Sequence, residues 1–173
     1  MKFSAAGEFL AAHDFGWDTT PAIRTEPTGY SVVIKDNRYP GIGSYCGDER
    51  FCPPEQHGAF AIVALRGDTL AELWSFRSTN SQSCARRPNG SLDCVSDHPD
   101  GFEWCINAPA LDAAGTVYAN SEDGALYAIR RDGSLLGTLF LELSREAAYT
   151  PLAIGPDGRL YAQNSGRLFV IGR

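Results

Sequence analysis

The chain has 173 residues, of which 43% are hydrophobic and 21% are charged, and its formal net charge at pH 7 is −6. This length and apolar content suffice for one globular domain with a core, which argues against a disordered chain. The acidic balance offers no basic surface for nucleic acid or an anionic membrane. The apolar runs are strand-sized and fall short of the roughly 20 residues that a membrane-spanning helix needs.

The first segment, residues 1–15, is predicted to be the outer strand of a β-sheet unit. A glycine turn at Gly7 precedes an alternating apolar run that begins at Phe9. Glu8 and His13 interrupt the apolar residues, so no secretory leader is visible in this chain.

Residues 16–77 predict one antiparallel unit of four short strands. The runs TTPAI, GYSVVIKD, AFAIVALR and AELWSF are rich in β-branched and aromatic residues. Short turns that contain Pro or Gly connect the first run to the second and the third run to the fourth. A long insertion over residues 36–58 separates the second strand from the third. A second insertion, residues 78–106, separates this unit from the next.

The two insertions carry all five cysteines. Cys46 and Cys52 lie six residues apart, and Cys84 and Cys94 lie ten apart, in polar loops rich in proline and glycine. Two local disulfides are therefore predicted, with Cys105 left over. Disulfides indicate a periplasmic or extracellular protein and, without a visible leader, the later part of a longer exported chain. The alternative is a cytosolic chain with five reduced thiols.

The strand pattern then repeats. Pro109 and Pro151 belong to two copies of one short strand motif and lie 42 residues apart, a period that fits one four-stranded blade. Residues 107–141 contain four strands broken by DAAG, EDG and RDG turns, and residues 147–173 contain three. The sequence predicts an all-β chain, a β-propeller of four-stranded antiparallel blades. About three blades are present, as a partial ring or half of a six-bladed dimer.

Both insertions are expected at one edge of the blades, because consecutive antiparallel strands reverse direction. The opposite edge receives only short turns, such as RTEPTG and RGDT. These turns are predicted to serve packing, and function is expected on the loop-elaborated edge.

Two stretches, GTVYANSEDGALYAIRRDGSLL and GRLYAQNSGRLFVIG, resemble the repeats of PQQ-binding-like (quinoprotein alcohol dehydrogenase-like) propellers, and the similarity covers nearly the whole chain. The resemblance implies the propeller fold. The family's dehydrogenases bind PQQ and calcium beside a ring of docking tryptophans and often a disulfide of adjacent cysteines. Trp74 fits a docking position, but no two cysteines of this chain are adjacent.

Two functions stay open at this point. One is a non-enzymatic binding or scaffold segment of an exported propeller, which recognises a polar small molecule or a protein. The other is part of a PQQ- and calcium-dependent dehydrogenase. The expected partners also include other blades of a longer chain or a second copy, whereas nucleic acid and membrane insertion are not expected.

Polar residues at the strand ends of the loop-elaborated edge are the candidate ligand-binding residues. Amides and carboxylates that converge at such a mouth can bind a polar ligand, although Asn and Asp are also what tight turns require. Trp104 is either a core residue or a stacking face for a planar ligand. The candidates are Asp36, Asn37, Arg38, Trp104, Asn107, Asn120 and Asn164.

The segment SDHPDGFEWC is a candidate calcium site through Asp97, Asp100 and Glu103. Their carboxylates are hard oxygen ligands, but their spacing matches no EF-hand loop, and a solvated turn is the alternative.

No catalytic residue is predicted. The histidines lack the spacing of a zinc site, and no G-x-S-x-G motif is present. The NGS sequence at Asn89 matches a glycosylation acceptor, but its position between Cys84 and Cys94 favours a hairpin turn.

Overall fold

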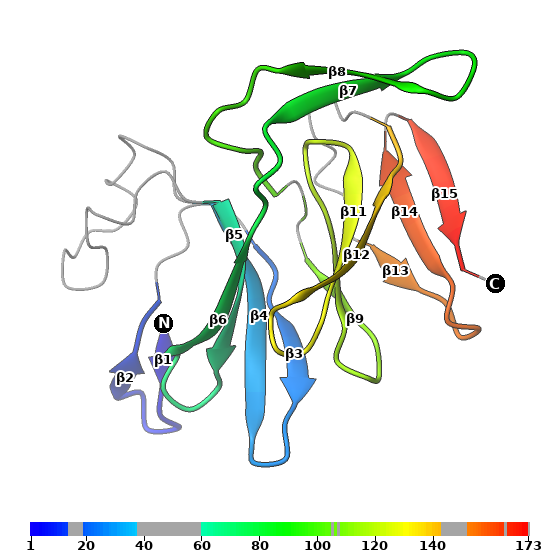
Figure 1. The fold of residues 1–173 in the computed structure, drawn as a ribbon. Helices are drawn as coiled ribbons and strands as arrows, with labels where there is room; N and C mark the ends of the chain where they lie inside the picture. The colour runs from blue at the N-terminus through cyan, green and yellow to red at the C-terminus, as the bar shows by residue number, and fades with distance from the viewer. Residues whose placement is uncertain are drawn as a thin grey trace.

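The computed structural model describes residues 1–13, 19–37, 60–104, 106, 108–142, 152–164 and 166–172. These residues form strands, turns and extended segments without a helix (Figure 1), which confirms the all-β prediction. All strand pairs are antiparallel, in sheets of two to four strands. Within the described ranges, no helix is long and apolar enough to cross a membrane.

The first large sheet contains β3 (Ala22–Thr25), β4 (Tyr30–Asn37), β5 (Phe60–Arg66) and β6 (Glu72–Arg77), in that order. Its central strands β4 and β5 are rich in valine and isoleucine, which suits burial on both faces of a sheet. The four strands lie where the sequence predicts four.

The second large sheet repeats this meander with β9 (Ala110–Leu111), β10 (Val117–Asn120), β11 (Ala125–Ile129) and β12 (Leu135–Phe140). The turn between β11 and β12 depends on Gly133, whose φ is 87°. In addition, a Cβ at this position would lie 2.8 Å from the side chain of Trp74. Glycine therefore provides both the turn and the close approach of two sheets.

The third sheet contains β13 (Ala153–Ile154), β14 (Leu160–Asn164) and β15 (Arg167–Ile171). The first strands of the three sheets, β3, β9 and β13, lie next to one another. The sheets are thus stacked face to face in chain order, with corresponding strands at corresponding places (Figure 1).

The N-terminal segment corrects the prediction of a single outer strand over residues 1–15. Residues 2–11 instead form a two-stranded hairpin of β1 (Lys2–Phe3) and β2 (Phe9–Ala11). The glycine at position 7 adopts a φ of 82° and reverses the chain between them. The Nζ atom of Lys2 donates hydrogen bonds of 2.8 and 2.7 Å to the carbonyl oxygens of Gly67 and Asp68, which attaches the hairpin to the turn after β5.

The second insertion, predicted as a loop over residues 78–106, contains a hairpin of β7 (Gln82–Arg86) and β8 (Leu92–Ser96). Cys84 and Cys94 lie opposite each other in its register and form a disulfide, which confirms that predicted pair. The Asn89 side chain accepts hydrogen bonds from the Ser91 backbone and hydroxyl, which is the geometry of a turn.

Reduction of the Cys84–Cys94 disulfide is expected to loosen the β7–β8 hairpin and to leave the stacked sheets folded. All of β8 is exposed, so the hairpin has little buried apolar surface of its own, and closing its loop is the main stabilising effect of the disulfide. Hydrogen exchange with and without a reductant should show faster exchange at residues 82–96 and unchanged exchange in β10 and β11. Equal acceleration in both regions would contradict this expectation.

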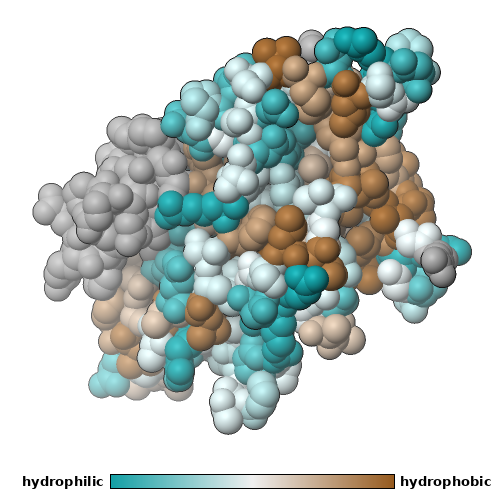
Figure 2. Space-filling model, viewed as in Figure 1, coloured by the Kyte–Doolittle hydropathy of each residue, from teal (hydrophilic) through white to brown (hydrophobic). Residues whose placement is uncertain are grey.

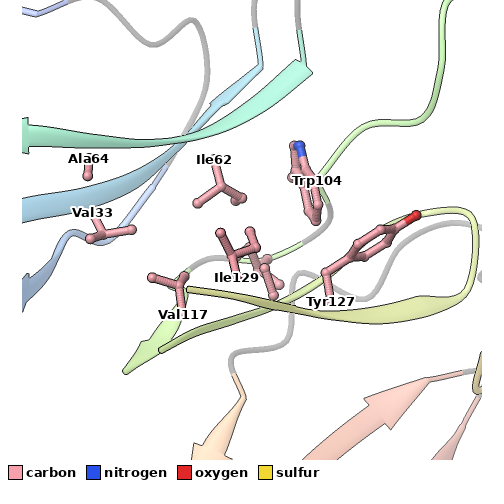
Figure 3. Packing of buried hydrophobic residues seen from close by; sticks show 9 residues of the cluster. Val33, Ile62, Ala64, Trp104, Val117, Tyr127 and Ile129 are labelled. Atoms are coloured by element: carbon pink, nitrogen blue, oxygen red, sulfur yellow. The ribbon is translucent and has the colours of Figure 1, made fainter. Parts of the chain in front are cut away.

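The described residues form three apolar clusters, two of which join neighbouring sheets. The largest lies between the first and second large sheets, where residues of β4 and β5 meet residues of β10 and β11 around Trp104 (Figure 3). A second cluster joins the second sheet to the third through Leu126, Leu152 and Leu160. A third lies within the first sheet around Ile34 and Val63.

Both long insertions leave the stack at one edge, as predicted. The first insertion follows the end of β4 and precedes the start of β5. The β7–β8 hairpin lies across this same edge, at the top of Figure 1. The short turns β3–β4, β5–β6, β9–β10 and β13–β14 lie at the opposite edge.

Candidate functional site

Asn37, a predicted ligand-binding residue, holds the chain's own backbone. Its side chain is only 1% exposed. The Nδ2 atom donates to the carbonyl oxygen of Trp104, and the Oδ1 atom accepts from the Trp104 backbone N–H, both at 3.2 Å. Because the amide is occupied on both sides, Asn37 fixes the segment that follows the β7–β8 hairpin and leaves no group for a ligand.

Trp104 corrects the prediction of a stacking face for a planar ligand. The residue is 0% exposed and packs between two sheets against Phe76 and Tyr127, with ring centroids 5.9 and 5.1 Å away (Figure 3). Its Nε1 atom is buried and has no hydrogen-bond partner among the described residues. The core interpretation of this tryptophan is therefore the correct one.

The remaining described candidates at this edge do not converge on one open site. The Asp36 carboxylate lies 3.4 Å from Nε2 of His13. Asn164 donates from Nδ2 to the backbone carbonyl of Glu142. Asn120 is buried, and its Oδ1 atom lacks a hydrogen-bond partner within the described ranges. Four predicted residues, Arg38, Asn107, Cys46 and Cys52, lie outside the described residues.

A buried network centred on Asp123 was missed by the sequence reasoning. This carboxylate is 1% exposed and accepts hydrogen bonds from the Tyr127 hydroxyl (2.5 Å), Asn80 Nδ2 (2.9 Å) and the Ala125 backbone N–H (2.9 Å). The Ser78 hydroxyl lies 3.0 Å from the Tyr127 hydroxyl. Burial and the bond to Asp123 raise the pKa of Tyr127 above its ordinary value. The network ties the start of the second insertion to the second sheet.

The acidic segment does not gather its carboxylates. Asp97 and Asp100 are exposed, Glu103 is half-buried, and the backbone carbonyl of Glu103 accepts bonds from Ser121 and Glu122. Among the described residues, no group of three or more His, Cys, Asp or Glu side chains could hold a metal ion. The acidic segment around Asp97 and Asp100 therefore forms a turn and does not form a metal site among the described residues.

Ser83, His98 and Asp97 lie together, but not as a nucleophilic triad. Asp97 Oδ1 accepts from the Ser83 hydroxyl at 2.6 Å and lies 2.8 Å from Nδ1 of His98, while the same Nδ1 atom lies 3.3 Å from Ser83 Oγ. The hydrogen bond from Ser83, followed by that from His98, lowers the pKa of Asp97 to about 2. A triad needs serine and aspartate on opposite ring nitrogens, so this arrangement stabilises the hairpin base instead.

The structure forms a pocket at the opposite edge, where only packing turns were expected. Its volume is about 350 Å³, within the range of small-molecule sites. It lies between the β3–β4 turn and the β5–β6 turn of one sheet. Its walls include Glu26, Gly29, Tyr30, Arg66, Asp68 and Leu73.

Hydrogen bonds fix the Glu26 wall of this pocket. Glu26 Oε1 accepts from Arg24 Nε and from the Ser31 hydroxyl, both at 2.7 Å, and Glu26 Oε2 accepts from Arg131 of the second sheet. Burial opposes ionisation of the carboxyl, but the hydrogen bonds from Ser31, Arg24 and Arg131 outweigh it and lower its pKa. The turn predicted to serve packing does join two sheets, and it also forms a pocket wall.

The lowered pKa of Glu26 gives an expected pH dependence. A carboxyl whose pKa is lower in the folded state stabilises the fold above its unfolded pKa of about 4.3. This stabilisation is lost as the pH falls through the folded pKa. Glu26→Gln should therefore destabilise the chain at pH 7, and the difference from the parent should shrink below about pH 4.

Urea denaturation of both proteins between pH 7 and pH 3 measures this difference. Glu72→Gln, at an exposed position of β6, is the control and should track the parent. A constant gap between Glu26→Gln and the parent over the whole range would contradict the expectation.

Comparisons with known proteins identify no family for this chain. No family model and no curated protein matches it. Among solved structures, it is similar to a protein of unknown function from Bacteroides caccae, with a TM-score of 0.29 and 12% identity over 64% of this chain and 53% of that one. It is also similar to a gluconolactonase from Xanthomonas campestris, with a TM-score of 0.29 and 15% identity over 96% of this chain and 62% of that one. The chain thus matches less than two thirds of either structure.

Proposed function

We propose that this chain is a segment of a β-propeller and acts as a non-enzymatic binding or scaffold module, whose partner is another sheet that packs on its exposed flank. The face-to-face stack of similar antiparallel sheets, with their first strands side by side, supports the propeller architecture. The Cys84–Cys94 disulfide is consistent with an oxidising, exported location.

The loop-elaborated edge supports a role without catalysis. The polar groups of Asn37, Asn164 and Asp123 bind to other groups of the chain. Buried side chains used in this way position loops, and these three side chains are not directed at a substrate. The part of this edge that the structure describes therefore favours a structural role in holding loops.

The observation that carries the proposal is the outer face of the third sheet. In β15, Phe169 and Ile171 pack against the second sheet, whereas Leu168 and Val170 on the other face are 62% and 54% exposed. Figure 2 shows hydrophobic residues gathered on this side of the molecule. A strand that is apolar on both faces is typical of a sheet that is covered on both sides. The apolar faces between the first and second sheets and between the second and third sheets are buried, whereas the outer face of β15 is exposed.

The solution mass tests this proposal, with a second copy of the chain as the partner. Light scattering after size exclusion should give a mass above the 18.7 kDa of one chain, rising with concentration. The double variant Leu168→Lys/Val170→Lys should return the mass to that of one chain, because charges would then face the partner sheet. Leu136→Lys, on exposed β12, is the matched control and should associate like the parent.

A mass of one chain at every concentration, or association that survives both lysines, would contradict the proposal. Circular dichroism confirms that each variant stays folded. The dehydrogenase alternative has its own measurement, a titration with PQQ and calcium chloride followed by tryptophan fluorescence. The proposal expects no saturable change, and saturable binding would favour the enzyme.

A further inference from the structure

We propose that the pocket between the β3–β4 and β5–β6 turns binds the ring of a neutral saccharide. This site lies at the edge opposite the long insertions and is independent of the association proposed above. Three features carry the proposal: a fixed aromatic ring, a rigid wall, and charged groups that are already paired.

The aromatic ring is that of Tyr30, at the start of β4. A Cβ on Gly67 would lie 2.3–2.6 Å from three atoms of this ring, so the ring lies directly on the backbone of Gly67. The Gly67 N–H also donates to the Tyr30 carbonyl at 2.9 Å. One side of the ring is thereby held, while the residue as a whole remains 44% exposed. A held ring with exposed surface is a platform for the apolar face of a sugar, and it loses little entropy on binding.

The turn that follows β5 is the rigid wall. The Arg66 N–H donates to the Ala71 carbonyl at 2.8 Å, and the Leu70 N–H donates to the Arg66 carbonyl at 2.9 Å. Lys2 fastens the same turn from the N-terminal hairpin. Leu70 has a φ of 57°, an uncommon conformation for a bulky residue. Such a conformation persists only where the surrounding structure holds it, as the hydrogen bonds of this turn do.

The charges of the pocket are paired within the protein. Arg66 donates two hydrogen bonds to Asp68, of 2.9 and 2.6 Å, and these bonds lower the pKa of the Asp68 carboxyl. Glu26 is held by Arg24 and Arg131. The two carboxylates that line the pocket are therefore already engaged by arginines, and the Arg66 guanidinium is engaged by Asp68. The exposed parts of these groups can accept from and donate to hydroxyl groups, which suits a neutral, hydroxyl-rich ligand.

Saturation-transfer NMR on the whole chain tests the proposal. The neutral probes are methyl β-D-glucopyranoside and cellobiose, and the charged probes are D-glucuronate and D-glucosamine. The neutral probes should bind saturably, with dissociation constants on the order of 1 mM, as expected for a shallow site. The charged probes should not bind more tightly.

Substitutions at the platform assign the binding to this pocket. Tyr30→Leu removes the ring and should weaken binding by about tenfold, whereas Tyr30→Phe keeps the ring and should change it by no more than about twofold. Gly67→Ala substitutes no side chain that lines the pocket but displaces the Tyr30 ring, so it should also weaken binding. Leu92→Ala, at an exposed residue of the β7–β8 hairpin at the opposite edge, is the control and should bind like the parent.

Three results would overturn the proposal. These are the absence of saturable binding by both neutral probes, binding by Tyr30→Leu equal to that of the parent, and clearly tighter binding of a charged probe. Thermal unfolding of each variant separates lost binding from lost folding. If Gly67→Ala fails to fold, the Tyr30→Leu and Tyr30→Phe pair still decides the question.

Discussion

Replacement of Trp104 by alanine is expected to lower the free energy of unfolding by about 3–5 kcal/mol, the range for loss of a large buried aromatic side chain. Trp104 is 0% exposed and fills the junction of two sheets beside Phe76 and Tyr127. Its loss would leave a cavity lined by residues of both sheets, which are too constrained by their strand pairing to close it. Urea denaturation, followed by circular dichroism, measures the effect.

Two further variants separate packing from polarity at this position. Trp104→Phe keeps a ring and removes the buried Nε1–H, which has no hydrogen-bond partner among the described residues, so its cost should be clearly smaller. Leu139→Ala, at an exposed position of β12, should cost less than about 1 kcal/mol. A Trp104→Ala protein as stable as the Leu139→Ala protein would show that the sheets do not pack around this residue.

The strands were predictable because local chemistry decides them. Alternating β-branched and aromatic runs, punctuated by turns such as DAAG and RDG, allow few structures other than short antiparallel strands. The Cys84–Cys94 pair was predictable for a similar reason, since the residues are close in sequence and flank a turn. The N-terminal hairpin was not predicted, because residues 2–11 give strands too short to show a period.

The candidate site depended on contacts between distant residues, and here the sequence was a weaker guide. Asn37 and Trp104 are 67 residues apart, and no local pattern shows that the amide of one binds the backbone of the other. The pocket was missed for a related reason. Tyr30, at the start of β4, and Gly67, just after β5, lie beside turns that look like packing elements, and only the β4–β5 register brings them together. The sequence signal that could have indicated this pocket is a tyrosine beside one turn together with a glycine just after the paired strand.

Asn37→Ala is expected to lower the free energy of unfolding by about 2–4 kcal/mol, although it removes only a small side chain. The substitution leaves the N–H and the carbonyl of Trp104 buried without partners. An unpaired buried polar group costs about 1–3 kcal/mol, so two such groups outweigh the loss of contact area. The tryptophan segment would then be held by packing alone.

Urea denaturation measures the total cost of Asn37→Ala, and hydrogen exchange at the Trp104 amide shows where it arises. Exchange at this amide should accelerate more than exchange at the amides of β10. Asn89→Ala is the matched control, because the Asn89 side chain bonds only within an exposed turn, and its cost should stay below about 1 kcal/mol. If Asn37→Ala costs no more than Asn89→Ala, water replaces the lost amide at low cost. The buried link between β4 and the second insertion would then contribute little to stability.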